Sequence, residues 1–441
     1  MKFYNTLTAQ LEEFTPVRPN HVSVYVCGPT VYSHIHVGNA RPLVVFDVLR
    51  RYLMQQKYDV HYVMNITDVN DKITTQAANE QTTELEIARK YTKSFMDDYT
   101  ALQSLPPSKW VRVSESIDSI VSYIQRLIDK GFAYEVDGDV YFRVHKIDEY
   151  GRLSGQKKDE LIAGSRVDVN PKKESPLDFV LWKNNERPES FESPFSMGRP
   201  GWHTECSCMI EDEFQSIIDI HGGGADLRFP HHENEMAQSL ALNNHPLANL
   251  WMHNARIDFG EEKMSKSLGN VILLKDLLHD YDANALRMYM LSTSYRTPMA
   301  FRFEQMEFYK TEWEKIQRTM AQLHIELDVF QAFNQLLDDT YMGHLNSNLG
   351  QDLNTANVIS DLYAMIKESN KAVRSQDKET MARMYNTILE YAKVLGLRFD
   401  LPSLSADDRS MYFNWVDARD NKDYDRADML REKLTQRGIL L

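Results

Sequence analysis

The feature that most constrains the fold is a strand-like segment followed by a helix-like segment, a pair that then occurs a second time. Residues 21–26 (HVSVYV) are rich in β-branched and aromatic side chains, which predicts a buried strand, and 39–52 carry apolar side chains at helical spacing. Residues 59–66 predict a second strand, and 84–102 predict a long amphipathic helix. This alternation predicts a parallel α/β sheet with right-handed crossovers.

The pattern changes after the second helix. Residues 133–142 predict a β-hairpin, because two β-rich runs flank an Asp-Gly pair. The chain is then polar and irregular up to about residue 200, and strands resume at 216–220. From residue 301 on only helical patterns remain, including those near 353–369, 378–395, 407–419 and 424–436. We therefore predict an α/β fold: a Rossmann-like parallel sheet split by an insertion, followed by a C-terminal α-helical bundle.

Length and composition narrow the class of protein. A chain of 441 residues exceeds one core and should form several domains. No apolar run reaches membrane-spanning length, and the first residues contain no signal-peptide core. Only three cysteines are present, which is typical of a reducing compartment, so we expect a cytoplasmic protein. The formal charge of −14 argues against sequence-blind coating of nucleic acid but is compatible with a local basic strip that holds a structured RNA.

Soft and polar metal ligands gather between residues 201 and 238. His231 and Glu235 stand four residues apart in a helical run, so both point from one face and can hold one side of a Zn²⁺ ion. Cys206 and Cys208 are an awkward pair for one ion, because residues two apart diverge in a helix and sit about 6–7 Å apart in a strand. One of them paired with Cys27 is the better arrangement. The alternative is that these cysteines are small buried hydrophobes and that His231 and Glu235 lie on a solvated helix face.

Two further segments indicate phosphate chemistry. Residues 36–39 (HVGN) lie where the first strand gives way to its helix, a position at which backbone N–H groups and the helix dipole favour phosphate. Residues 262–270 (EKMSKSLGN) form a Ser- and Gly-containing segment with two lysines, which can close over a triphosphate. Each motif alone is weak, but their occurrence in this order around an insertion is a strong signal.

The two motifs resemble the HIGH and KMSKS motifs of class I aminoacyl-tRNA synthetases. The segments YVCGPTVY, NITDVNDK, GRPGWHTEC and DIHGGGADLRFPHHENE resemble the cysteinyl-tRNA synthetase family in particular. The resemblance runs from about Phe3 to Leu440.

The resemblance implies one zinc ion held by Cys27, Cys206, His231 and Glu235. Cys208 falls where the family needs no ligand. A soft thiolate binds Zn²⁺ far better than a neutral hydroxyl, so the ion would select cysteine over serine, which shape alone separates poorly. The family's amino acid pocket corresponds to Trp202 as a wall and to Thr67 and Asp226 as orienting groups.

The resemblance also implies the reaction: activation of L-cysteine by ATP, with Mg²⁺ on its phosphates, and transfer to tRNA(Cys). His36, Asn39, Lys263 and Lys266 would stabilise the charge that develops on phosphoryl transfer. The implied ATP-binding residues are Gly28, His36, Gly38, Asn39, Gly222, Gly223, Gly224, Lys263 and Lys266. We expect a monomer that binds no DNA and no membrane.

The predicted segments follow from the patterns and the resemblance together. They are the sheet domain's first half (1–115), a connective insertion (116–200), the sheet's second half (201–250), a KMSKS and stem-contact region (251–305), a helical bundle (306–400) and shortened anticodon-binding helices (401–441). Family members usually continue past this point with a basic extension. Residues 401–441 carry seven Lys and Arg against eight Asp and Glu, so no basic patch replaces the extension; either anticodon recognition is weak or the chain has been shortened.

Two alternative functions compete with tRNA charging. One is a related ligase that activates cysteine and joins it to a small amine, but that relative lacks most of the helical tail found here at 309–437. The other is a catalytically silent tRNA- or metal-binding relative. The intact motif lysines, the motif histidine and the four ligand residues argue against it.

Overall fold

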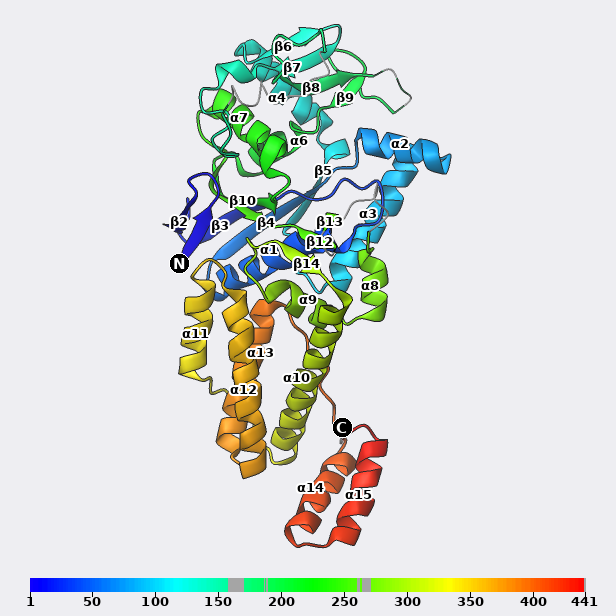
Figure 1. The fold of residues 1–441 in the computed structure, drawn as a ribbon, viewed down its shortest axis with the longest axis vertical. Coiled ribbons are helices and arrows are strands. Elements are labelled where there is room, and N and C mark those ends of the chain that lie inside the picture. Colours follow the sequence, from blue (N-terminus) through cyan, green and yellow to red (C-terminus); the bar gives the residue numbers. More distant parts are fainter. Residues whose placement is uncertain (158–169, 186, 188, 260–261, 264–270, 440–441) are drawn as a thin grey trace. The chain divides into compact units, whose positions relative to one another are not determined.

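The computed structural model describes residues 1–157, 170–185, 187, 189–259, 262–263 and 271–439 (Figure 1). These residues form two compact units. One contains Lys2–Leu278 and Tyr295–Ala300, and the other contains Met1, His279–Ser294 and Phe301–Leu441. The first unit contains the β-sheets and the second is built from helices.

A five-stranded sheet forms the centre of the first unit (Figure 1). Its order is β11-β10-β3-β4-β5 and every neighbouring pair is parallel, which confirms the predicted parallel α/β architecture. The strands are β3 (His21–Val26), β4 (Asp59–Ile66), β5 (Lys109–Arg112), β10 (Ile218–Gly224) and β11 (Ala248–Asn254). Strand β10 begins two residues later than the predicted strand start and runs through all three glycines, which therefore lie in a strand.

Three helices connect the first half of the sheet: α1 (Val37–Gln55), α2 (Asp71–Glu80) and α3 (Glu84–Ala101). Helices α1 and α3 match the predicted segments, whereas α2 was not predicted. The local sequence specifies where α2 and α3 begin: Asn70 caps α2, and Thr83 forms a capping box with Glu86 at the start of α3. Nearly every apolar side chain of α1 is buried, as expected for a helix that covers a sheet.

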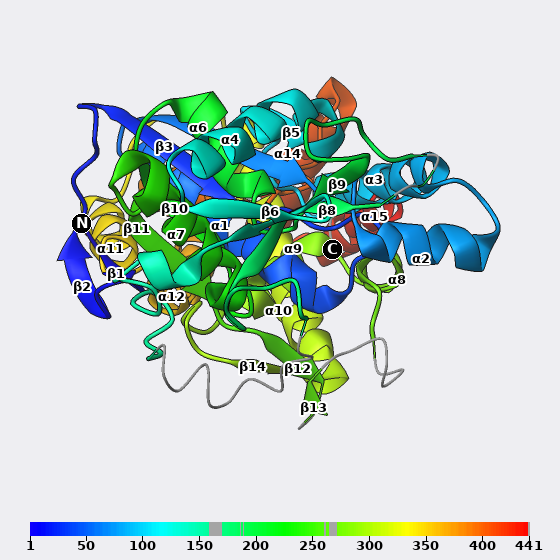
Figure 2. The same ribbon diagram turned by 90° about the horizontal axis from the view of Figure 1, so that it is seen from above.

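The polypeptide between β5 and β10 adds a second, antiparallel sheet above the first in Figure 1. It contains β6 (Ala133–Val136), β7 (Asp139–Phe142), β8 (Phe179–Asn184) and β9 (Gly198–Pro200), preceded by helix α4 (Ile117–Asp129). The predicted hairpin is confirmed as β6–β7. Both turn residues have positive φ, 51° at Asp137 and 80° at Gly138, as a tight two-residue hairpin turn requires. Helices α6 (Glu205–Phe214) and α7 (Glu233–Asn243) then flank β10 (Figure 2).

Small elements complete the first unit. They are the N-terminal hairpin β1 (Lys2–Asn5) and β2 (Gln10–Glu13), and the strands β12 (Ile257–Phe259), β13 (Glu262–Lys263) and β14 (Met299–Phe301), with helix α8 (Leu274–Asp280). Met1, the last residues of α8 and Phe301 are assigned to the second unit. The two Lys residues of the KMSKS segment were predicted site residues. Lys263 is placed by its backbone in β13, and Lys266 lies outside the described residues.

The second unit is helical, as predicted. Its helices are α9 (Ala283–Leu291), α10 (Phe303–Val329), α11 (Asp339–Leu349), α12 (Thr355–Ser375), α13 (Lys378–Leu395), α14 (Ala406–Asp420) and α15 (Tyr424–Gln436). The last four confirm the helices predicted from periodicity. Side-chain caps from Asp377, Ser405 and Asp423 begin α13, α14 and α15. A small core that includes Tyr412 and Leu434 joins α14 to α15.

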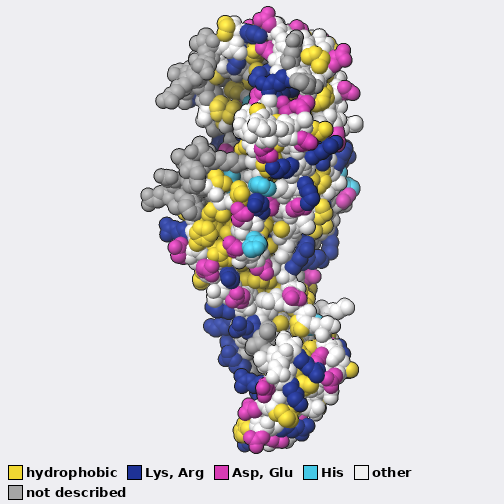
Figure 3. All heavy atoms as spheres, turned by 90° about the vertical axis from the view of Figure 1, so that its right-hand side faces the viewer, with side chains coloured by type: hydrophobic (Ala, Val, Ile, Leu, Met, Phe, Trp, Pro, Cys, Tyr) yellow, Lys and Arg dark blue, Asp and Glu magenta, His cyan; other side chains and the backbone are white. Residues whose placement is uncertain are grey.

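The surface is not uniformly acidic despite the net charge of −14. On the face drawn in Figure 3, Lys and Arg side chains are interspersed with Asp and Glu. Within the part of the chain that the structure describes, no helix combines the length and apolar character needed to span a membrane.

Candidate active site

The carboxyl ends of β3 and β10 meet at the centre of the parallel sheet. Strand β3 is followed by connections toward β4 and β5, whereas β10 leads to β11 on the other side, so the strand order reverses between them. Such a switch point is where open α/β sheets bind ligands. Cys27 directly follows β3, and its N–H donates to the Gly222 carbonyl at 3.1 Å. The structure therefore places the Cys27 turn beside the glycine run.

Four predicted metal ligands converge at this point. The Cys27 and Cys206 sulfurs are 3.6 Å apart, and His231 Nε2 lies 3.8 Å and 3.9 Å from them. Glu235 Oε1 lies 2.8 Å from His231 Nε2 and 3.8 Å from the Cys27 sulfur. Tetrahedral Zn²⁺ with bonds of about 2.0–2.3 Å separates its ligand atoms by roughly 3.3–3.8 Å. The two sulfurs and the imidazole nitrogen have this spacing, and a small shift of the Glu235 carboxylate completes it.

Each ligand comes from a different local structure. Cys27 follows a strand, Cys206 lies in the first turn of α6, and His231 lies in the irregular turn that precedes α7. Glu235 lies in the first turn of α7, one helical turn beyond His231, as the spacing predicted. Cys206, His231 and Glu235 are all at most 2% exposed. Because an unpaired buried charge is costly, such a group is held by mutual pairing or by a cation.

Cys208 is separate from this group. It lies two residues beyond Cys206 on α6, and its sulfur approaches Asp212 at 4.0 Å. Burial is the main reason that the pKa of Cys208 is raised well above its ordinary value. The helical geometry therefore separates the two cysteines in the way the two-residue spacing predicted.

Electrostatics inside the group favour one ionised thiol. Hydrogen bonding with Cys27 is the main cause that lowers the pKa of Cys206 to about 7, whereas burial raises the pKa of Cys27 well above its ordinary value. Burial opposes charge on His231, but Glu235 and Cys206 outweigh it and raise its pKa to about 10. Burial likewise opposes charge on Glu235, but three histidines, led by His231, lower its pKa well below the usual range. The charges thus compensate one another.

Three histidines around the group were not among the predicted site residues. His221 Nε2 lies 2.6 Å from Glu235 Oε2, and its other ring nitrogen lies 3.0 Å from the Tyr25 carbonyl oxygen. His232 Nε2 lies 3.3 Å from the Cys27 sulfur. Cys27, His221, His232 and Glu235 consequently form a second, overlapping set of possible ligands. The set with both sulfurs and His231 suits zinc better, and His221 then serves as an outer partner that orients Glu235.

The third of these histidines is His203. Its Nδ1 lies 3.2 Å from His231 Nδ1, on the side of the His231 ring away from the sulfurs. Burial lowers the pKa of His203 to about 3, so a neutral ring can accept a hydrogen bond from His231. This contact fixes His231 with Nε2 directed at the thiols.

The three residues predicted to bind the substrate amino acid differ in their contacts and their burial. The Trp202 ring stacks on His231 at 4.4 Å between centroids. Thr67 is buried and its hydroxyl donates to Glu205 Oε2 at 3.0 Å, a partner that was not predicted. The other oxygen of Glu205 is buried without a hydrogen-bond partner among the described residues. Asp226 is exposed and follows the end of β10.

The predicted phosphate-binding segment forms the start of α1. His36 caps the helix: its ring accepts from the Gly38 N–H at 3.1 Å, and the Asn39 side chain accepts from the His36 N–H at 3.1 Å. The Gly38 N–H is thereby paired within the cap, and the Val37 N–H donates to the Ile272 carbonyl at 3.0 Å. Gly28 packs so closely on the Asn65 backbone that a Cβ would overlap its carbonyl oxygen. Close packing against Asn65 therefore explains why a residue without a side chain stands at position 28.

Comparison with known proteins agrees with this geometry. Residues 13–311 match the family of class I (C) tRNA synthetase catalytic domains, and 346–400 match the DALR domain. A curated cysteine–tRNA ligase of Onion yellows phytoplasma is 41% identical, and that of Acholeplasma laidlawii is 42% identical; each is covered over 100% of both chains. The chain belongs to the cysteine–tRNA ligase family. It is thus an enzyme of the class I aminoacyl-tRNA synthetases.

A further curated relative and two solved structures extend the comparison. The cysteine–tRNA ligase of Oceanobacillus iheyensis is 42% identical over 100% of this chain and 97% of its own. A solved methionyl-tRNA synthetase of Mycobacterium tuberculosis superposes with a TM-score of 0.61 at 15% identity, over 85% of this chain and 89% of that one. A leucyl-tRNA synthetase of Agrobacterium radiobacter gives 0.63 at 10% identity, over 87% and 84%. These structures share the class I fold.

Proposed function

We propose that the protein activates L-cysteine with ATP and transfers it to tRNA(Cys), and that a resident Zn²⁺ selects the thiol of the substrate. The observation that carries this proposal is the group of Cys27, Cys206, His231 and Glu235 at the carboxyl edge of the sheet. Two thiolates, an imidazole and a carboxylate are a borderline-soft donor set that suits Zn²⁺. Bound there, zinc would supply a Lewis acid that binds a substrate thiolate more strongly than the hydroxyl of serine.

The residues near the metal group would position the amino acid. Trp202, stacked on His231, would cover the side chain and keep water from it. Thr67 donates its hydroxyl hydrogen to Glu205 and accepts from Asn65 Nδ2 at 3.1 Å, so one oxygen lone pair is left to accept from the substrate ammonium group. Asp226 would provide the countercharge for that ammonium group. These contacts fix the carboxylate for attack on the α-phosphate of ATP.

The start of α1 would hold the phosphates of ATP together with Mg²⁺. His36 and Asn39 lie at the start of this helix, where the helix dipole favours phosphate. Lys263 and Lys266, from the segment predicted to close over the triphosphate, would neutralise charge on the leaving pyrophosphate. The glycines leave the carboxyl end of β10 without side chains, and at Gly224 only the Asp226 carboxylate lies where a Cβ would be, so that a nucleotide can approach the backbone there.

The decisive experiment is charging of purified tRNA(Cys) with cysteine and with serine. We expect cysteine to be esterified to the RNA and serine to be rejected, with about one equivalent of zinc by elemental analysis. A parallel reaction with a small amine acceptor tests the alternative ligase. Product formed on the amine and not on the tRNA would contradict the proposal. The proposal also includes action as a monomer in the cytoplasm, which sedimentation and fractionation would test.

A further inference from the structure

Asn65, Thr67 and Glu205 form a hydrogen-bond relay between the two cysteine segments of the metal group. The Gly28 N–H donates to Asn65 Oδ1 at 2.7 Å, and Asn65 Nδ2 donates to Thr67 Oγ1 at 3.1 Å. Thr67 Oγ1 donates in turn to Glu205 Oε2 at 3.0 Å. Gly28 and Glu205 are each next in sequence to a cysteine of the metal group, so both ends of the relay adjoin proposed zinc ligands.

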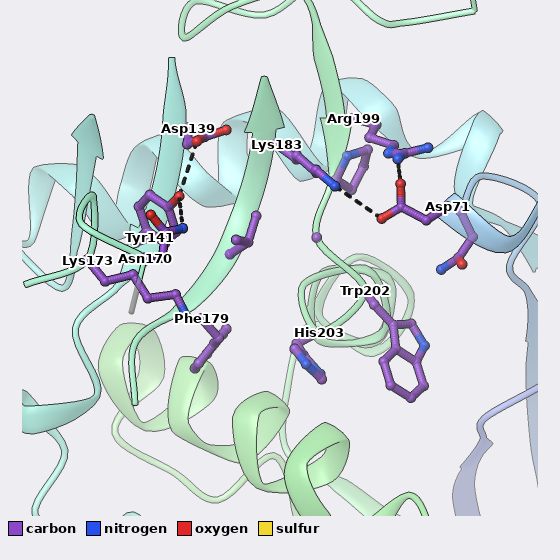
Figure 4. Close-up of a pocket in the computed structure, with 14 residues that line it drawn as sticks. Asp71, Asp139, Tyr141, Asn170, Lys173, Phe179, Lys183, Arg199, Trp202 and His203 are labelled. Atoms are coloured by element: carbon purple, nitrogen blue, oxygen red, sulfur yellow. Dashed lines mark hydrogen bonds and ion pairs between the residues drawn. The ribbon is translucent and has the colours of Figure 1, made fainter. Parts of the chain in front are cut away.

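The relay lies in the protein interior. Its three side chains are at most 2% exposed. Trp202 and His203, which precede α6, line a cleft of about 550 Å³ (Figure 4), and none of the three relay residues lines that cleft. Because buried polar groups take their hydrogen bonds from the protein, the neighbouring residues set the direction of each hydrogen bond in the relay.

The direction of these hydrogen bonds follows from the Gly28 end. A backbone N–H can only donate, so the amide oxygen of Asn65 faces Gly28 and its NH₂ group faces Thr67. The Thr67 oxygen therefore accepts from Asn65, and its single hydrogen points to Glu205. One lone pair of the Thr67 oxygen remains.

Glu205 serves the relay as an acceptor. Its Oε2 can accept whether the carboxyl group is ionised or holds a proton on the other oxygen, so this role does not depend on the charge of the group. Among the described residues, the other carboxyl oxygen has no hydrogen-bond partner. Glu205 therefore acts on its surroundings through the hydrogen of Thr67.

The remaining lone pair of Thr67 suits an ammonium group, which has three hydrogens to donate and no acceptor. A hydroxyl that pointed its own hydrogen at such a group would oppose it, whereas a lone pair binds it. A thiol that lacks an amino group gains nothing from this lone pair. The direction of the Thr67 hydroxyl therefore distinguishes the two kinds of thiol.

We propose that Glu205 is a positioning residue: with Asn65 on the other side, it holds the Thr67 hydroxyl with a lone pair toward the substrate, so that the site selects thiols that carry a free ammonium group. The inference rests on the proposed function, because that function places Thr67 beside the amino acid. Zinc would recognise the thiol, and the relay would recognise the ammonium group of the same molecule.

The test compares calorimetric binding of L-cysteine with that of 3-mercaptopropionate, which is cysteine without its amino group. Glu205→Met replaces the acceptor by an apolar side chain of similar length, so the Thr67 hydrogen loses its partner. We expect cysteine to bind about 10- to 100-fold more weakly, the value of a hydrogen bond to a charged group, and 3-mercaptopropionate to bind as to the wild type. Thr204→Val is the matched control, since this adjacent hydroxyl is buried without a partner among the described residues.

A double-mutant cycle shows whether Glu205 acts through Thr67. Thr67→Val removes the hydroxyl and keeps the shape, so it should weaken binding of cysteine but not of 3-mercaptopropionate. Adding Glu205→Met to this variant should cause no further loss. Thr67→Ser keeps the hydroxyl and should bind both ligands as the wild type does. If Glu205→Met does not fold, equal effects of Thr67→Val on the two ligands would still overturn the inference.

Other results would also overturn the inference. Equal weakening of both ligands by Glu205→Met would indicate a general distortion of the site, and unchanged cysteine binding would show that the Thr67 hydrogen does not need Glu205. Loss of zinc from this variant would assign Glu205 to holding Cys206. Absence of cysteine-dependent ATP–pyrophosphate exchange in the wild-type protein would instead contradict the proposed function, and this measurement needs no variant.

Discussion

Replacement of each buried cysteine of α6 by serine separates metal binding from packing. Cys206 and Cys208 are 2% and 1% exposed and lie two residues apart on the same helix, so Cys206→Ser and Cys208→Ser bury the same hydroxyl in similar surroundings. Burying a hydroxyl without a partner costs about 1–3 kcal/mol in either variant. The variants differ in one respect: only Cys206 has its sulfur 3.6 Å from that of Cys27.

The magnitude of the difference follows from ligand loss. Removing even an outer partner of a metal site lowers affinity about 10- to 100-fold, so removal of a direct ligand should exceed 100-fold. At a free zinc concentration of about 1,000 times the wild-type Kd, binding stabilises the folded protein by about 4 kcal/mol, which the Cys206→Ser variant loses in large part. The Cys208→Ser variant should keep both its zinc and this stabilisation.

Three measurements on the two variants and the wild type test which cysteine binds zinc. They are zinc content after dialysis, the free energy of unfolding with and without a chelator, and cysteine-dependent ATP–pyrophosphate exchange. We expect zinc and exchange to be lost in Cys206→Ser, and the chelator to have no further effect on its unfolding. If Cys208→Ser lost the zinc instead, or if both variants retained it, the assignment of ligands from the geometry would be refuted.

Four further substitutions test other parts of the structure. Burial raises the pKa of Asp98 to about 6, whereas an unfolded Asp titrates near a pKa of about 3.9, so the free energy of unfolding should fall as pH rises from about 4 to about 6. Asp98→Asn should therefore raise the free energy of unfolding by about 1–3 kcal/mol at pH 8 and by little at pH 4. Equal denaturation midpoints of variant and wild type at pH 8 would contradict this. Gly222→Ala would overlap the Phe46 ring and should lower the free energy of unfolding by about 1–3 kcal/mol. Gly224→Ala meets only the movable Asp226 carboxylate, so it should raise the KM for cysteine with little loss of stability. A larger loss of stability in Gly224→Ala than in Gly222→Ala would show that the glycines serve another purpose. Lys266→Ala should slow ATP–pyrophosphate exchange about 100- to 1,000-fold with the fold intact, and an unchanged rate would remove this lysine from the reaction.

Local patterns predicted most of the architecture. Strands β3 and β4, helices α1 and α3, the β6–β7 hairpin and helices α12 to α15 all form near the predicted residues, because periodicity, turn chemistry and burial agree in each of these segments. Helix α4 was not predicted, although Ile117, Ile120 and Ile124 recur at helical spacing. Helix α2 has a weaker apolar pattern and depends on its Asn70 cap and on packing of Ile73 and Ala77 in a small core. Neither of these two helices affects the predicted fold class.

The sequence by itself determined the candidate ligand types and the one candidate pair that lies within one helical turn, because His231 and Glu235 are positioned by local geometry. The tertiary structure decided which cysteine joins Cys27, since that contact spans 179 positions along the chain and depends on β3 and α6 meeting at one edge of the sheet. It also decided the roles of His203, His221 and Glu205, whose partners lie on other elements. A side chain's neighbours within a turn follow from its own segment, but neighbours across a core follow only from how all segments pack.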